Sequence, residues 1–102
     1  MNIIDLRDLC NDDTIQITAH VLKRCRERKI TLDDIIRCIM YGEIIESYPD
    51  DYPYPSALVM EYKIGKPLHV VAGVGGGKLW VITAYFPSPD KWECNFRIRK
   101  EL

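Results

Sequence analysis

The spacing of apolar residues changes near Gly42, from the period of a helix to the period of a strand. Before this point, the segments 19–28 and 32–41 carry apolar residues at helical intervals. After it, β-rich runs are separated by turns that contain glycine and proline, which predicts strands. Helices followed by strands, without alternation of the two, favour an α+β fold.

A threonine suited to helix capping precedes each of the two predicted helices. The Thr18 hydroxyl can accept a hydrogen bond from an N–H group in the first turn of the helix at 19–28. Thr31 has the same place before 32–41, and the acidic residues that follow it suit the positive end of a helix. Gly42 fits a left-handed residue just past the end of the second helix.

The second half of the chain predicts an antiparallel sheet built from consecutive strands. Gly65-Lys66 and the three glycines at 75–77 suit the turns between neighbouring strands. Two N-terminal helices would then pack on one face of a four-stranded antiparallel sheet. The predicted strands are 44–48, 57–64, 67–74 and 79–86.

Length and composition set limits on the class of protein. A chain of 102 residues suits a single domain with one modest core. Its apolar runs are all shorter than the roughly 18 residues that cross a membrane. The acidic first residues are unlike a signal peptide, so we expect a cytoplasmic protein with no membrane partner.

The four cysteines show no spacing typical of a zinc site or a redox pair. Reduced, buried thiols are the expectation for a protein without a signal peptide, and we predict no metal and no cofactor. A metal site assembled from His20, Cys25 and His69 is the alternative. The cysteines are Cys10, Cys25, Cys38 and Cys94.

The net charge is −1, which argues against a protein that coats nucleic acid by charge alone. The charge is uneven, because basic residues outnumber acidic ones at 19–30 and at 91–101. The second of these segments contains Lys91 and Arg97. If the two segments meet in the fold, they form a local anion site on a nearly neutral protein.

The first predicted helix places His20, Arg24 and Arg28 at intervals of four residues. Such positions drift by only about 40° per step, so the three side chains share one helix face. An imidazole that transfers protons, beside two permanent cations, suits phosphate chemistry. The alternative is an ordinary solvated face, whose arginines pair with Glu27 or with an acidic loop.

The strands carry a second set of candidate residues. Thr83 and Tyr85 fall on one face of the strand at 79–86, with Trp80 and Ile82 on the other. His69 lies in an apolar strand, where a hydrogen-bonded structural histidine is the alternative to a functional one. On the first predicted strand, Glu46 and Tyr48 likewise share one face.

An ordered series of motifs resembles the DUF4258 domain family over residues 18–92. The series is TAHVLKRCRERKIT, YGEIIESYP, KPLHVVAGV and WVITAYFPSPDKW. The family is similar in layout to ribonuclease toxins of the RelE and BrnT type, and to the barnase-, EndoU- and colicin-like ribonucleases that need no metal. This resemblance implies a RelE-like fold, with residues 1–17 as an N-terminal extension.

The resemblance also implies an activity and a set of site residues. The chain would be a toxin-type endoribonuclease, in which the 2′-hydroxyl of RNA attacks the adjacent phosphate, with an antitoxin-like protein as a partner. A protein-interaction module without activity, on the same fold, is the alternative. The catalytic candidates are His20, Arg24, Arg28, His69, Thr83 and Tyr85, and the substrate-binding candidates are Tyr48, Lys91 and Arg97.

Overall fold

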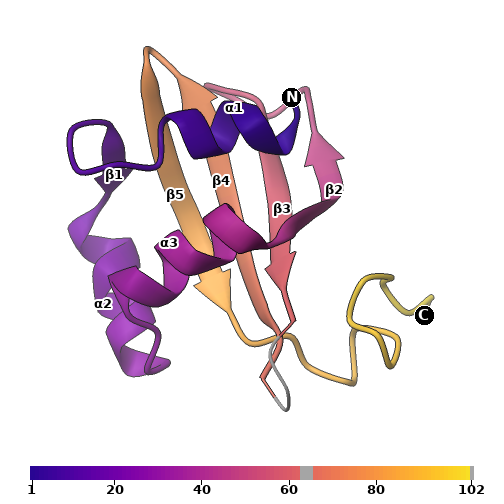
Figure 1. Cartoon of the computed structure of the whole chain (residues 1–102). Coiled ribbons are helices and arrows are strands. Elements are labelled where there is room, and N and C mark those ends of the chain that lie inside the picture. The colour runs from indigo at the N-terminus through magenta and orange to yellow at the C-terminus, as the bar shows by residue number, and fades with distance from the viewer. Residues whose placement is uncertain (63–65, 102) are drawn as a thin grey trace.

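The computed structural model describes residues 1–62 and 66–101, and it shows a mixed sheet of five strands and three helices within them (Figure 1). The strand order is β1-β5-β4-β3-β2. The predicted α+β class is confirmed. The predicted arrangement of four antiparallel strands and two helices is wrong in detail, because a further helix and a parallel strand precede them. The elements are α1 (Ile3–Asp8), β1 (Ile15–Ile17), α2 (Ala19–Glu27), α3 (Leu32–Tyr41), β2 (Glu43–Tyr48), β3 (Ser56–Glu61), β4 (Leu68–Gly75) and β5 (Lys78–Tyr85).

The two additional elements lie in the first 17 residues. β1 pairs in parallel with β5, with Ile15 opposite Leu79. α1 is held to the end of α3, because the Arg7 guanidinium donates to the carbonyls of Ile39, at 3.0 Å, and Gly42, at 2.8 Å. Both elements are too short to leave a clear period, and their partners lie far along the chain. These N-terminal residues contribute to the core, where Leu6 is fully buried.

Both predicted helices and their threonine caps are confirmed. Thr18 accepts the N–H of Val21 at 3.2 Å, and Thr31 accepts the N–H of Asp34 at 3.1 Å. The Asp34 carboxylate in turn accepts the N–H of Thr31 at 2.9 Å, which completes a capping box. The hydrogen bond from the Thr31 N–H is the main cause that lowers the pKa of Asp34.

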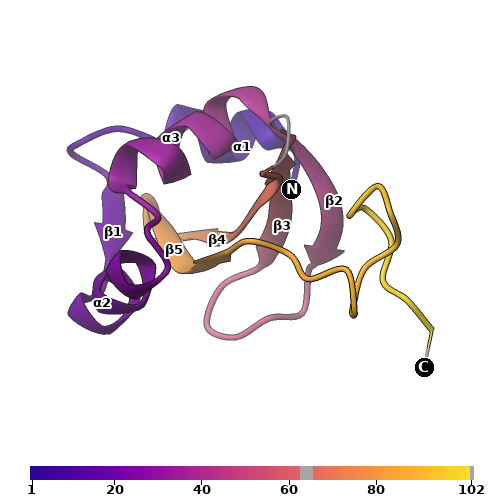
Figure 2. The ribbon, with the colours of Figure 1, turned by 90° about the horizontal axis from the view of Figure 1, so that it is seen from below.

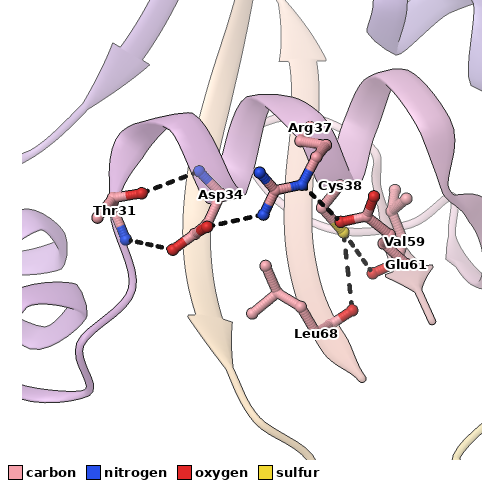
Figure 3. A network of polar contacts seen from close by, with 7 residues as sticks. All are labelled: Thr31, Asp34, Arg37, Cys38, Val59, Glu61 and Leu68. Atoms are coloured by element: carbon pink, nitrogen blue, oxygen red, sulfur yellow. Dashed lines mark hydrogen bonds and ion pairs between the residues drawn. The ribbon is translucent and has the colours of Figure 1, made fainter. Parts of the chain in front are cut away.

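Polar contacts also attach α3 to the sheet beneath it (Figure 3). Arg37 lies 2.8 Å from Asp34 on its own helix and 3.4 Å from Glu61 at the end of β3. The thiol of Cys38 lies 3.6 Å from the carbonyl of Val59 and points between two strands. Burial raises the pKa of Cys38 to about 12, so this thiol is a structural group rather than a reactive one.

Gly42 is not the left-handed residue that the sequence predicts. Its φ is −86° and its ψ is −167°, so the backbone is extended there. A side chain at this position would lie 2.4 Å from the carbonyl oxygen of Cys38 and 2.6 Å from that of Met60. Glycine is required because α3 turns directly into β2 there, and two backbone oxygens occupy the space that a Cβ atom would need.

The sheet separates two layers (Figure 2). α1 and α3 cover one face, where apolar residues of β3, β4 and β5 form the main core. The loop 49–55 and the C-terminal segment 88–101 lie toward the opposite face. α2 lies at the β1–β5 end of the sheet, away from the C-terminal segment (Figure 1).

A bulge in β5 changes which residues share a face. The pairing shifts between Val71, opposite Thr83, and Ala72, opposite Val81. Ile82 is therefore the extra residue of the bulge. As a result, Trp80 lies on the same face as Thr83, contrary to the strict alternation that we expected.

The turns agree with the sequence wherever the structure describes them. Gly76 and Gly77 have φ values of 61° and 72° and connect β4 to β5. The predicted turn at Gly65-Lys66, and the end of the predicted strand 57–64, fall partly outside the described residues. Of the helices within the described residues, none is long and apolar enough to cross a membrane.

Candidate functional site

A cleft of about 210 Å³ opens between α2 and the bulged end of β5. α2 and its C-cap residue contribute one imidazole and two guanidiniums at intervals of four residues, and β5 contributes a hydroxyl. The structure thus brings together four of the six predicted catalytic residues. The lining residues are His20, Val21, Arg24, Cys25, Arg28, Ile82, Thr83 and Ala84.

Arg28 connects the two walls of this cleft, which we name the cationic cleft. One of its terminal nitrogens donates to the carbonyl of Ala84 at 2.8 Å and lies 3.5 Å from the Thr83 hydroxyl oxygen. A guanidinium has five N–H donors in a planar fork, so donors remain for a ligand. Within residues 1–62 and 66–101, the ion pairs include neither Arg24 nor Arg28.

Cys25 also lines the cationic cleft. The side chain is buried, and burial raises its thiol pKa, although the nearby Arg28 opposes this. A protonated thiol is a poor nucleophile. The polar groups of the cleft that are exposed to a ligand are those of His20, Arg24 and Arg28.

His69 and Tyr85 do not join this cleft. His69 is fully buried on β4, where its Nε2 lies 2.8 Å from the carbonyl of Phe96 and its Nδ1 lies 3.3 Å from the Tyr85 hydroxyl. The carbonyl accepts from Nε2–H, so the Tyr85 hydroxyl donates to Nδ1. Burial lowers the pKa of His69. This neutral histidine holds the C-terminal segment against the sheet.

The same face carries an ionic cluster that the sequence did not suggest as a unit. The Arg99 guanidinium lies 3.0 Å from Glu46 and covers the ring of Trp92 at 4.7 Å. Burial would raise the pKa of Glu46, but hydrogen bonds from Arg99 and Tyr48 lower it overall. The sequence predicts that Glu46 and Tyr48 share one strand face. It does not predict that Arg99 lies beside them, because the C-terminal residues have no regular apolar spacing.

The three predicted substrate-binding residues also lie away from the cationic cleft. Tyr48 donates to Glu46. Arg97 pairs with Glu43 on β2. The side chain of Lys91 is exposed, and its backbone carbonyl accepts the N–H of Lys100 at 2.9 Å. The two basic segments therefore do not combine at α2 into one anion site.

Further clefts adjoin the cationic cleft on either side. One, of about 600 Å³, shares Val21 and Ile82 with it and contains Tyr52, Tyr54 and Trp80. Sequence reasoning missed the position of Trp80, because the bulge at Ile82 has no marker in the residue pattern. The other cleft, of about 420 Å³, shares Arg28 with the cationic cleft. Its other lining residues are Lys29, Lys66, Pro67, Phe86, Pro87, Pro89 and Phe96.

Together, the fold and the site define a small α+β protein with a cationic cleft at one end of its sheet. The chain belongs to the DUF4258 family, because it matches the family described as "Domain of unknown function (DUF4258)" over residues 17–86. No curated protein and no solved structure gives a significant match. The matched range contains the whole cationic cleft, and it excludes α1 and the C-terminal segment.

Proposed function

We propose that this chain is a metal-independent endoribonuclease of the toxin type, with the cationic cleft as its active site. One observation carries the proposal: His20, Arg24, Arg28 and Thr83 line one cleft. Imidazole supplies a proton-transfer group near neutral pH. Guanidinium groups bind phosphate oxygens through paired hydrogen bonds.

In the proposed reaction, His20 accepts the proton of a ribose 2′-hydroxyl. The 2′-oxygen attacks the adjacent phosphorus, the bond from phosphorus to the 5′-oxygen breaks, and a 2′,3′-cyclic phosphate forms. The leaving 5′-oxygen takes a proton from the imidazolium or from water, since His20 is open to solvent. Arg24 and Arg28 stabilise the charge that develops on the phosphate oxygens.

The layout of the chain supports the same class of enzyme. α1 and α3 on one face of a mainly antiparallel sheet match part of the layout implied by the resemblance to RelE- and BrnT-type toxins, whereas α2 lies at the β1–β5 end. This is an analogy of fold, so the residues of the cleft carry the functional argument. An antitoxin-like partner with acidic side chains would cover the cationic cleft and block it.

The alternative is a module that binds an acidic protein segment and has no activity. The cationic cleft also suits this candidate, because guanidinium pairs with carboxylates as well as with phosphates. Addition of a partner strand to the outer edge of β2 has less support. That edge strand has a bulge and carries Glu43 and Glu46, two features that disfavour edge pairing.

A cleavage assay on a single-stranded RNA, with and without a metal chelator, tests the proposal. The wild type should produce 2′,3′-cyclic phosphate ends in both conditions. His20→Ala should reduce the rate roughly 10²–10⁴-fold, the usual range for acid–base catalysis. Arg24→Ala should also reduce it, while Arg26→Ala serves as the matched control, since Arg26 is exposed on α2 outside the cleft.

The outcomes separate the two candidates. Full cleavage by His20→Ala would exclude the assigned role of that histidine. Intact RNA with the wild-type protein, together with binding of a polyglutamate peptide that needs Arg24, would favour the protein-binding module instead.

A further inference from the structure

Three neighbouring clefts follow one another along α2 and β5. The cationic cleft lies in the middle, the cleft with Tyr52 and Trp80 adjoins it through Ile82, and the cleft with Lys66 adjoins it through Arg28. We refer to the first neighbour as the aromatic cleft and to the second as the lysine cleft. Because adjacent clefts share lining residues, one extended ligand can occupy all three.

The middle cleft is suited to a phosphate rather than to a whole nucleotide. Its volume of about 210 Å³ is below the range of about 300–1,000 Å³ that small-molecule sites usually have. The aromatic cleft, at about 600 Å³, falls within that range. A larger group attached to the phosphate would therefore enter the aromatic cleft.

The side chains of the aromatic cleft are suited to a nucleobase. Tyr54 and Trp80 stack with their ring centroids 6.0 Å apart, and the indole N–H of Trp80 donates to the carbonyl of Gly75 at 3.1 Å. Tyr52 is 96% exposed at the same cleft, so its ring is free to stack on a base. Every nucleobase has a flat face that stacks on such rings.

Charge disfavours a phosphate in this part of the groove. Asp51 lines the aromatic cleft and accepts a hydrogen bond from Ser56, so it brings a carboxylate rather than a cation. A carboxylate repels phosphate but accepts N–H groups at the edge of a base. The lysine cleft has the opposite charge, with Arg28, Lys29 and Lys66, and suits the next phosphate along a strand.

We propose that the aromatic, cationic and lysine clefts form one groove for single-stranded RNA, with an unstacked base on Tyr52 and the backbone across Arg24, Arg28 and Lys66. This inference rests on the proposed function and specifies its substrate as single-stranded. Bases within a duplex are already stacked on one another, so they are not available to the tyrosine.

Binding of a fluorescein-labelled, 2′-O-methylated RNA hexanucleotide, which cannot be cleaved, tests the groove by fluorescence anisotropy. Tyr52→Ala should weaken binding roughly 5- to 150-fold, the range that loss of one stacking contact produces. Tyr41→Ala is the matched control, because Tyr41 is also exposed, at 79%, and lines none of the three clefts. The same strand annealed to its complement should bind more weakly than the single strand.

The two proposals can fail separately in this experiment. If the hexanucleotide binds and Arg24→Ala weakens it, but Tyr52→Ala or duplex formation has no effect, the groove is wrong and the phosphate site remains. If Arg24→Ala has no effect or the hexanucleotide does not bind, both proposals are overturned. If polyglutamate displaces the hexanucleotide from the wild type but binds Tyr52→Ala more weakly, the groove would be assigned to a protein segment instead.

Discussion

The two histidines of this chain lie in contrasting surroundings. His20 is exposed on α2 and faces a cleft, so its ring nitrogens are open to a ligand. His69 is fully buried, and both of its nitrogens lie within hydrogen-bonding distance of protein oxygens. Surroundings rather than residue type assign the first to proposed catalysis and the second to structure.

The buried His69 predicts a dependence of stability on pH. Burial lowers the pKa of its imidazole from the ordinary value of 6.5, so the unfolded chain binds a proton first as the pH falls. The free energy of unfolding should therefore be highest above about pH 6.5 and should decrease below it, by up to about 1.4 kcal/mol per pH unit. Urea denaturation between about pH 7.5 and pH 5 measures this decrease.

A variant separates this effect from the titration of carboxylates. His69→Gln keeps a donor for the Phe96 carbonyl but does not titrate, so its stability should be less dependent on pH over that range. Glu46 and Asp34, whose pKa values are lowered, lose their contribution only in more acidic solution. An unchanged slope in His69→Gln would show that another group is responsible.

At the scale of elements, the junction of α3 and β2 is the most restricted point of the chain. The helix ends at Tyr41 and the strand begins at Glu43, so one residue makes the whole connection. Arg7 of α1 also donates to the carbonyl of that residue, Gly42, at 2.8 Å. Three elements therefore depend on the backbone at a single glycine.

Gly42→Ala should be more destabilising than an ordinary glycine substitution. The added methyl group would lie 2.4 and 2.6 Å from two backbone oxygens, which cannot move without displacing α3 or β3. We expect the free energy of unfolding to fall by about 3 kcal/mol, at the upper end of the range for overpacking. Chemical denaturation measures this destabilisation, with Gly77→Ala as the comparison variant.

The comparison variant isolates backbone strain from steric overlap. Gly77 has a φ of 72°, and a side chain there would meet no atom within 4 Å. Gly77→Ala should therefore lower the free energy of unfolding by only about 1–2 kcal/mol, the conformational cost of a left-handed alanine. Equal losses in the two variants would contradict the steric explanation at Gly42.

At the scale of the whole molecule, the C-terminal segment covers the part of the second sheet face around His69, which α1 and α3 leave uncovered. Trp92 is 3% exposed and packs edge-on to His69, with ring centroids 4.5 Å apart. Leu58 and Met60 are buried as well, on the face of the sheet that His69 occupies. This segment lies outside the family match, yet it completes a second core.

Trp92→Ala should therefore destabilise the whole fold. Removal of a buried aromatic side chain typically costs about 3–5 kcal/mol. Ile98→Ala, in the same segment, should change stability by less than about 0.5 kcal/mol, because Ile98 is 60% exposed. Thermal or urea unfolding compares them, and a stable Trp92→Ala protein would show that the segment is not part of the core.

The overall charge predicts a weak dependence of RNA binding on salt. With a net charge of −1, attraction arises locally in the groove and not from the molecule as a whole. Contact with two phosphates of a single strand gives a slope of about −1.4 in log K against log salt, or roughly a seven-fold loss between about 50 and 200 mM. Anisotropy titrations with the hexanucleotide measure this slope. A slope steeper than about −3 would indicate a wider electrostatic surface than the groove.

The sequence by itself determined the elements that local interactions specify. α2 and α3 follow from apolar periodicity and from Thr18 and Thr31, because a helix and its cap form between residues three or four apart. The shared face of His20, Arg24 and Arg28 follows from the same geometry. Helical spacing alone is therefore enough to group these three side chains.

Only the tertiary structure decided how distant segments combine. Arg7 meets Gly42, Ile15 pairs with Leu79, and Arg99 reaches Glu46, all through contacts between parts of the chain that share no local pattern. The bulge at Ile82 likewise arises from pairing with β4 and moves Trp80 to the face of the proposed groove. Periodicity records which side of an element is apolar, whereas the partner of that side depends on packing throughout the molecule.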